Sequence, residues 1–411
     1  MARESRAAER LVEVASEIVR AHSRSPHITD MHRPNDPPCS RAQTHGWRRR
    51  RPGARRRIWQ RLIVLLAGLG LGLGTLAHAA TAPPHEPELD GMQLSVDEHL
   101  LSDAPDHNYA GGGAISASGS FARHDGLDTV LGAIDRFTLG YEDRATELTP
   151  PWHALAVGML VFTPRNLRRS RAIPGERPYA SLVFASTARR YLERDGAVSY
   201  QSDLMFGMLG LAAVGQFQNA LHRLTQSQRA YGWGQQISAG GEPTAGYSLS
   251  RAALLAGEPR GAHRYDLHWT AAASVGTITE GSLALALRWG RIESPWWANA
   301  PEQNLYVQET HPLPPPLPRG APPELFVLLG VRLTARLYNA FLEGQFRHSA
   351  VRYSFGDLNP LLGDAWAGFE FRTHHLAIRY LIRWESPELR SGTGAHSFFW
   401  GNVEITVPLG G

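Results

Sequence analysis

Gln218 and His222 are the residues whose type and spacing best suit acid–base chemistry in this chain. They stand four residues apart within the stretch 215–233, and residues at this spacing share one face of a helix. An apolar stripe adjoins them at Phe217, Leu221 and Leu224. A neutral imidazole can take a proton from water, which makes His222 a candidate general base. The alternative is a surface or core histidine, because the chain has 18 histidines. We expect the apolar stripe to pack against the protein and the polar face to act.

The segments around this short helix are predicted to be strands. Runs of about ten residues alternate apolar and polar side chains, with Gly, Pro, Asn and Asp between them. In 325–337 every odd residue is apolar, while Arg332, Thr334 and Arg336 face the other way. Another candidate strand lies near Phe137. The pattern predicts an all-β fold, a transmembrane antiparallel β-barrel, because only closure satisfies every backbone group in lipid. A soluble sandwich or lipocalin-like barrel has the same period.

The first 79 residues are predicted to direct export. An arginine-rich run at 48–57 precedes the apolar stretch 62–76 and an A-x-A motif ending at Ala79. This is the pattern of a secretory signal peptide, and a transmembrane anchor is the alternative, although about 20 apolar residues are needed to span a bilayer. We therefore divide the chain into an overlong or disordered leader (1–44), a signal peptide (45–79), a flexible N-terminal segment (80–113) and the barrel (114–411).

Composition limits the functions that remain open. Of 42 arginines and 38 acidic residues, 15 and 6 lie in the first 79 residues, so their removal changes the net charge from +4 to −5. The basic character of the whole chain therefore gives no support to nucleic-acid binding. Cys39 is the only cysteine, so the exported chain cannot use a disulfide, a thiolate metal site or a cysteine nucleophile.

The connection 293–323 contains the run HPLPPPLPRGAPP, which cannot form a strand. It is predicted to be a large external loop with a polyproline section.

Several short motifs occur in an order that resembles one family. They are 135–141 (DRFTLGY), 162–164 (FTP), 176–180 (ERPYA), 218–223 (QNALHR) and 232–237 (GWGQQI). In this order the chain resembles the LpxR-type outer-membrane lipid A 3'-O-deacylases, over about residues 115–403.

The resemblance implies a barrel of about 12 strands, with the site near its outer rim beside a short helix from an external loop. It implies that His222 is the base that activates water, that Thr138 and Gln218 belong to the site, and that a divalent cation, calcium-like, stabilises the ester oxyanion. The basic loop residues Arg168, Arg169 and Arg171 would meet the phosphates of lipid A, since guanidinium groups suit phosphate oxygens. The partner would be lipid A or lipopolysaccharide, and the protein would be a monomer in the bacterial outer membrane.

The chain departs from the family where the cation is expected. The family carries an Asn-Asp pair near the first strand, and the region 121–128 here reads FARHDGLD. Asp125 or Asp128 could supply oxygen ligands, but Arg123 would repel a divalent cation and His124 is a poor calcium ligand. The other function considered is a non-catalytic barrel that binds lipopolysaccharide or passes solutes.

Overall fold

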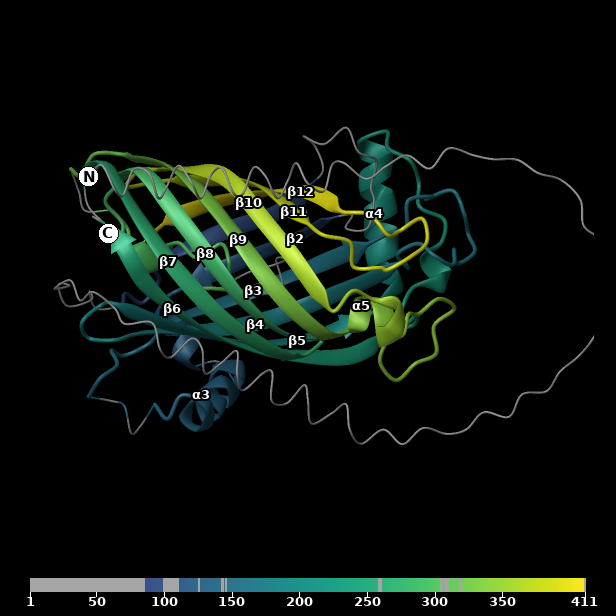
Figure 1. Cartoon of the computed structure of the whole chain (residues 1–411), viewed down its shortest axis with the longest axis horizontal. Helices are drawn as coiled ribbons and strands as arrows, with labels where there is room; N and C mark the ends of the chain where they lie inside the picture. The colour runs from purple at the N-terminus through teal and green to yellow at the C-terminus, as the bar shows by residue number, and fades with distance from the viewer. Residues whose placement is uncertain are drawn as a thin grey trace, which may run out of the picture. The chain divides into compact units, whose positions relative to one another are not determined.

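Twelve antiparallel strands form a closed barrel within the described residues, and β12 pairs with β1 to complete the ring (Figure 1). The computed structural model describes residues 86–98, 111–124, 126–141, 144, 146–257, 261–303, 306, 310–317 and 320–409. The strands are β1 (Gly91–Glu98), β2 (Gly111–Ser118), β3 (Trp152–Phe162), β4 (Ala180–Leu192), β5 (Val198–Leu209), β6 (Glu242–Gly257), β7 (Gly261–Gly276), β8 (Ile278–Ile292), β9 (Glu324–Asn339), β10 (Leu361–Arg372), β11 (Ala377–Glu385) and β12 (Phe398–Pro408). The helices are η1 (Ser120–His124), α3 (Gly126–Thr138), α4 (Ala212–Leu224), η2 (Trp233–Gln235), η3 (Trp296–Ala298), α5 (Ala340–Glu343) and η4 (Phe355–Asp357). None of the helices in these ranges has the length and apolar character needed to cross a membrane.

The strands turn their apolar side outward, which decides between the two β-folds open to the sequence. On β9, Leu325 and Leu333 are exposed while Arg332 and Arg336 are buried inside the ring. Arg336 bonds to Glu280 at 2.7 Å, so the lumen holds paired charges. A soluble barrel would bury the apolar side, whereas lipid requires it outside. The predicted transmembrane β-barrel is confirmed.

The two ends of the barrel differ. We call the end at Gly91 and Pro408 the terminal rim, since an even number of strands returns both chain ends to it. Its described connections include the short turns 193–197 and 373–376. The opposite end, where β5 passes into α4, is called the α4 rim, and α5 lies there too (Figure 1).

The barrel begins earlier in the chain than expected. The segment 80–113 was predicted to be flexible, but β1 lies inside it and pairs with both β2 and β12. On β1 the exposed Met92 and Leu94 alternate with the buried Gln93 and Asp97. β1 has only eight residues and polar segments on both sides, so its alternation of apolar and polar residues is hard to recognise in the sequence. The leader 1–44 and the signal peptide 45–79 lie outside the described residues.

The expected strand near Phe137 is the helix α3. It packs on the outer wall of the barrel against β4 and β5, on the side of the terminal rim (Figure 1). Leu127, Val130, Ile134 and Phe137 recur at helical spacing, which accounts for the difference.

The β8–β9 connection is not an external loop. It leaves the terminal rim and enters the barrel, where we call its described residues 296–303, 306 and 310–317 the plug. Glu302 accepts a hydrogen bond from Thr270 at 2.9 Å and lies 3.0 Å from His268. Arg379 donates to Asn299 at 2.8 Å. Charged groups on the inner wall need partners once they leave water, and the plug supplies them.

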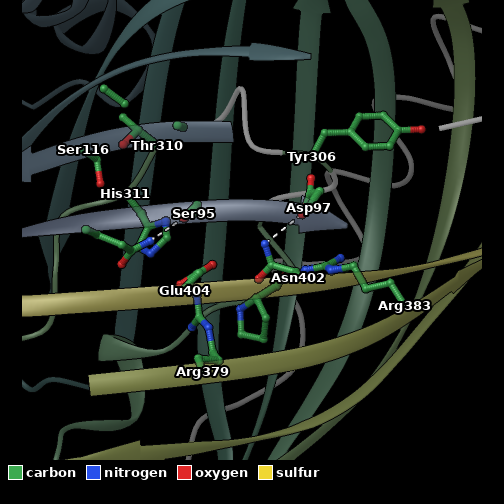
Figure 2. Close-up of a pocket in the computed structure, with 14 residues that line it drawn as sticks. Ser95, Asp97, Ser116, Tyr306, Thr310, His311, Arg379, Arg383, Asn402 and Glu404 are labelled. Carbon is green, nitrogen blue, oxygen red and sulfur yellow. Dashed lines mark hydrogen bonds and ion pairs between the residues drawn. The ribbon is translucent and has the colours of Figure 1, made fainter. Parts of the chain in front are cut away.

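A small polar cavity remains between the plug and the wall. Figure 2 shows its lining, in which Thr310 and His311 of the plug face Ser95, Asp97 and Glu404 of the wall. Burial lowers the pKa of His311 to about 4, so its imidazole is neutral at physiological pH. The lumen is therefore a packed interior along the plug.

Candidate functional site

The helix α4 is fastened to the α4 rim by an apolar cluster. Its members come from β3, the β3–β4 loop, α4 and the segment around η2: Val161, Leu167, Tyr179, Val214, Ala230 and Trp233. The loop 163–179 is tied to the segment after α4, because the Tyr231 amide donates to the Leu167 carbonyl at 3.0 Å. Helix and loop form one assembly at the rim.

The faces of α4 are arranged in the opposite sense to the prediction. Phe217, Leu221 and Leu224 are exposed, whereas Gln218 and His222 are buried. The polar face is turned toward residues 228–233, which fold back along the helix. The apolar stripe of Phe217, Leu221 and Leu224 points away from the protein, toward lipid or solvent.

The hydrogen bond of His222 determines which of its ring nitrogens can act as a base. Nδ1 lies 2.5 Å from the carbonyl oxygen of Gln228, and a carbonyl only accepts, so Nδ1 carries the proton. In the neutral ring Nε2 then holds the lone pair. No group in the described ranges bonds to Nε2. Gln226 makes this bond possible, since its left-handed φ of 57° turns the chain back after the helix.

Gln218 braces the site. Its Oε1 accepts from Nε1 of Trp233 at 3.0 Å, so its carbonyl is occupied inside the protein. Gly215 lies beneath the same indole, and a Cβ there would come within 2.4 Å of the Trp233 ring. The structure therefore puts Gln218 in a positioning contact one turn before His222.

The three arginines of the β3–β4 loop that were expected to meet phosphate, Arg168, Arg169 and Arg171, are exposed at the same rim. Arg168 donates from Nε to Oε1 of Gln228 at 3.0 Å, so it binds the side chain of the same residue whose backbone carbonyl holds His222. The Arg169 carbonyl lies against Gly232. Arg171 forms no hydrogen bond or ion pair with the described residues. The structure thus brings His222, Gln218 and Arg168 together.

Thr138 and Asp128 are not brought to this site. Both belong to α3, on the outer wall toward the terminal rim, while α4 lies at the opposite end (Figure 1). Thr138 bonds to the hydroxyl of Tyr247 at 2.9 Å. Both carboxylate oxygens of Asp128 accept from Arg189, at 2.7 and 2.6 Å, so they are not available to a cation. Asp125 lies outside the described residues. The structure therefore does not bring Thr138 and Asp128 to His222, because both belong to the helix α3 on the outer wall.

The sequence analysis missed the acidic pair at the end of β1. Asp97 is buried and accepts a hydrogen bond from Asn402 at 2.8 Å, and Glu98 follows at the α4 rim. In the ladder Asp97 pairs with Gly112, which pairs with Leu160, the neighbour in β3 of Val161 in the cluster that holds α4. The alternation in 92–97 is the signal that could have identified this strand.

Known proteins were compared with the chain by family, by sequence and by structure. The family model described as outer membrane protein LpxR matches residues 64–409. No curated protein matches by sequence. Among solved structures, LpxR from Salmonella typhimurium superposes with a TM-score of 0.59 at 14% identity, covering 77% of this chain and 99% of that one. The β domain of the Bordetella autotransporter BrkA gives a TM-score of 0.37 at 7% identity, covering 78% of this chain and 99% of that one. The first structure shows the same fold, and with the family match it establishes that the chain belongs to the outer membrane protein LpxR family.

Proposed function

We propose that the protein is an outer-membrane esterase that hydrolyses the 3'-O-linked acyl group of lipid A. Membership of the LpxR family supports the class of activity. The observation that carries the mechanism is the hydrogen bond from His222 Nδ1 to the Gln228 carbonyl, which leaves Nε2 as the basic nitrogen. A carbonyl partner fixes the tautomer without adding a charge.

The reaction follows from that tautomer. Nε2 of His222 takes a proton from a water molecule while the water oxygen attacks the ester carbonyl carbon. The tetrahedral intermediate collapses with cleavage of the bond between the carbonyl carbon and the sugar oxygen. The imidazolium returns its proton to that oxygen. The products are a fatty acid and a free hydroxyl on the sugar.

The α4 rim suits an acylated and phosphorylated substrate. Short turns lie on the periplasmic side in bacterial barrels, so the terminal rim is periplasmic and the α4 rim faces the outer leaflet. Exposed Arg168, Arg169 and Arg171 can bind phosphate oxygens there. The outward stripe with Phe217 and Leu221 meets acyl chains on the same side. Phosphate and hydrocarbon contacts in one assembly match the two chemical parts of lipid A.

We further infer that a divalent cation, calcium by its oxygen preference, is held at the end of β1. Asp128 does not fit, because Arg189 occupies its carboxylate. The Asp97 carboxylate fits better, since it stands near the end of the first strand at the α4 rim, and the family resemblance places an Asn-Asp pair near the first strand. A cation there would stabilise the negative charge on the ester oxygen. In this proposal the carboxylate of Asp97 supplies oxygen ligands to the cation near the α4 rim.

Passage of solutes is the less favoured function. The plug crosses the lumen and bonds to its wall at Arg190 through the Pro312 carbonyl and at Ser118 through the Leu313 amide. A pathway would require these contacts to break.

The proposal is tested by mass spectrometry of lipid A from cells that express each variant. His222→Asn should lower acyl release by about 10²- to 10⁴-fold, the usual contribution of a general base. His348→Asn, an exposed histidine at the same rim, is the matched control and should leave release unchanged. Chelation of divalent cations should stop release by the wild-type protein, and added calcium should restore it. Wild-type release from a His222→Asn variant would refute the assignment of the base, and an unaltered lipid A profile with the wild-type protein would favour a non-catalytic barrel.

A further inference from the structure

The outward face of α3 is apolar although nothing in the described chain covers it. Phe137 is 91% exposed and Val130 is 46% exposed. Leu127 and Ile134 lie on the same side of the helix, at the spacing that aligns side chains along one face. A helix packed on a protein in water normally turns this stripe toward the protein.

The face of α3 toward the barrel carries two acidic side chains, Asp128 and Asp135, with one apolar side chain, the fully buried Leu131, between them. Asp128 forms a two-pronged ion pair with Arg189, and the Arg189 guanidinium also donates to the Asp128 carbonyl at 3.0 Å. Asp135 accepts from the hydroxyls of Tyr191 at 2.7 Å and Ser202 at 2.8 Å. Both carboxylates are buried, with Asp135 fully enclosed. The helix is therefore held to the wall by charge and hydrogen bonds.

These partners belong to the outside of the barrel. Arg190 bonds to Gln201 at 2.6 Å and to the plug, so its side chain points into the lumen. Its neighbours Arg189 and Tyr191 therefore point outward, as does Ser202, which pairs with Arg189 in the ladder.

The outward surface changes character along these two strands. Nearer the α4 rim the outward positions are exposed and apolar, as at Val183, Phe206 and Met208. Nearer the terminal rim they are Arg189, Tyr191 and Ser202, which α3 covers. Ser202 lies only four residues from the start of β5, and Thr138 at the end of α3 reaches Tyr247 within β6. The helix thus stands where the lipid-facing band would otherwise be interrupted by polar groups.

We propose that α3 lies in the membrane, parallel to the barrel wall, with Val130 and Phe137 in the acyl chains of the phospholipid leaflet at the terminal rim. Charged outward side chains in a lipid-facing band are destabilising, and the helix removes this cost by pairing them. Its own stripe continues the apolar band of Phe206 and Met208. An amphipathic helix with this stripe toward the acyl chains is stable in such a position.

Contact with lipid explains the reversed orientation better than contact with a protein does. Gly132 lies so close to the wall that a Cβ there would be 2.4 Å from the Arg189 guanidinium, so the helix is fixed in this rotation. The stripe of Val130 and Phe137 borders the apolar outer surface of the barrel and is exposed to the same lipid.

Site-directed spin labels can test this position, because Cys39 is the only native cysteine. In a Cys39→Ser background, labels at Val130→Cys and Phe137→Cys are compared with Phe206→Cys on the lipid-facing wall and Glu147→Cys on an exposed charged site. The protein is reconstituted in phosphatidylcholine vesicles, and collisions are measured with oxygen, which partitions into hydrocarbon, and with a water-soluble nickel chelate.

Both α3 labels should behave like Phe206→Cys, with frequent oxygen collisions and about tenfold fewer nickel collisions than Glu147→Cys. Nickel collisions equal to those of Glu147→Cys would place the stripe in water and overturn the proposal. Protection from both reagents would show a protein contact, such as a second copy of the chain, and would also overturn it. The outcome is independent of esterase activity.

Discussion

The ion pair between Asp128 of α3 and Arg189 of the barrel wall is expected to contribute to the stability of the folded protein. Replacing Asp128 by Ala leaves the Arg189 guanidinium, which is 16% exposed, against the wall without its partner. Removing one member of a buried pair costs about 3–5 kcal/mol. We expect Asp128→Ala to lower the midpoint of urea unfolding in lipid vesicles. Glu147→Ala is the matched control, since the Arg144–Glu147 pair is more exposed and such pairs contribute less than about 1 kcal/mol. Equal midpoints for the two variants would contradict this account.

At this scale the sequence identified some residues of the site and not others. His222 and Gln218 could be found because i, i+4 spacing is local and survives folding. The bond from His222 to the Gln228 carbonyl could not, because it depends on the left-handed turn at Gln226. The similarity of 135–141 to a family motif did not indicate where the segment lies, since Asp135 and Thr138 bond to the outer wall.

The elements at the α4 rim depend on a close contact between a helix and an indole ring. Gly215→Ala would place a methyl group 2.4 Å from Trp233, so the ring must move and its bond to Gln218 is lost. We expect acyl release to fall at least about tenfold while the barrel remains folded, because misplacement of about 1 Å costs catalysis strongly. Gly234→Ala is the matched control, since nothing lies within 4 Å of an added Cβ there. Release is measured on lipid A, and folding by the heat-dependent mobility of the barrel in gels. Full activity of Gly215→Ala would show that Trp233 does not position the site.

The two helices of 13 residues share a reversed polarity that periodicity cannot reveal. Both α3 and α4 bury acidic or amide and imidazole groups and expose the apolar stripe. A helical period states that two faces differ, but the solvent determines which face turns outward. The prediction for α4 assumed water, and lipid reverses it.

At the scale of the whole molecule, the plug is expected to close the lumen. Replacing residues 296–317 by a short Gly-Ser linker removes Glu302 and Asn299, which bond to Thr270 and Arg379 on the wall. We expect the wild-type protein to show little conductance in planar bilayers and the shortened protein to show stable channels. The matched control replaces the exposed loop 390–393 at the opposite rim. Conductance of the wild type equal to that of the shortened protein would show that the plug leaves a pathway open.

The barrel was predictable from sequence, while its contents were not. Alternation in strands such as β9 reports which faces differ, and that pattern is independent of neighbours. The proline-rich run in 293–323 excludes a strand but does not say whether the loop lies outside or inside. Whether the loop lies inside or outside depends on buried arginines from four or more strands. These arginines come together only when the ring forms.

The position of the plug has a consequence for assembly. The plug belongs to the β8–β9 connection, whereas the ring is closed by the pairing of β1 with β12, the first and last strands to be joined. Both ends of the plug connection join the ring at the terminal rim, so the plug reaches the lumen through that rim and leaves the β1–β12 seam uncrossed. Assembly of this protein thus includes filling the barrel with one of its own connections, the segment between β8 and β9.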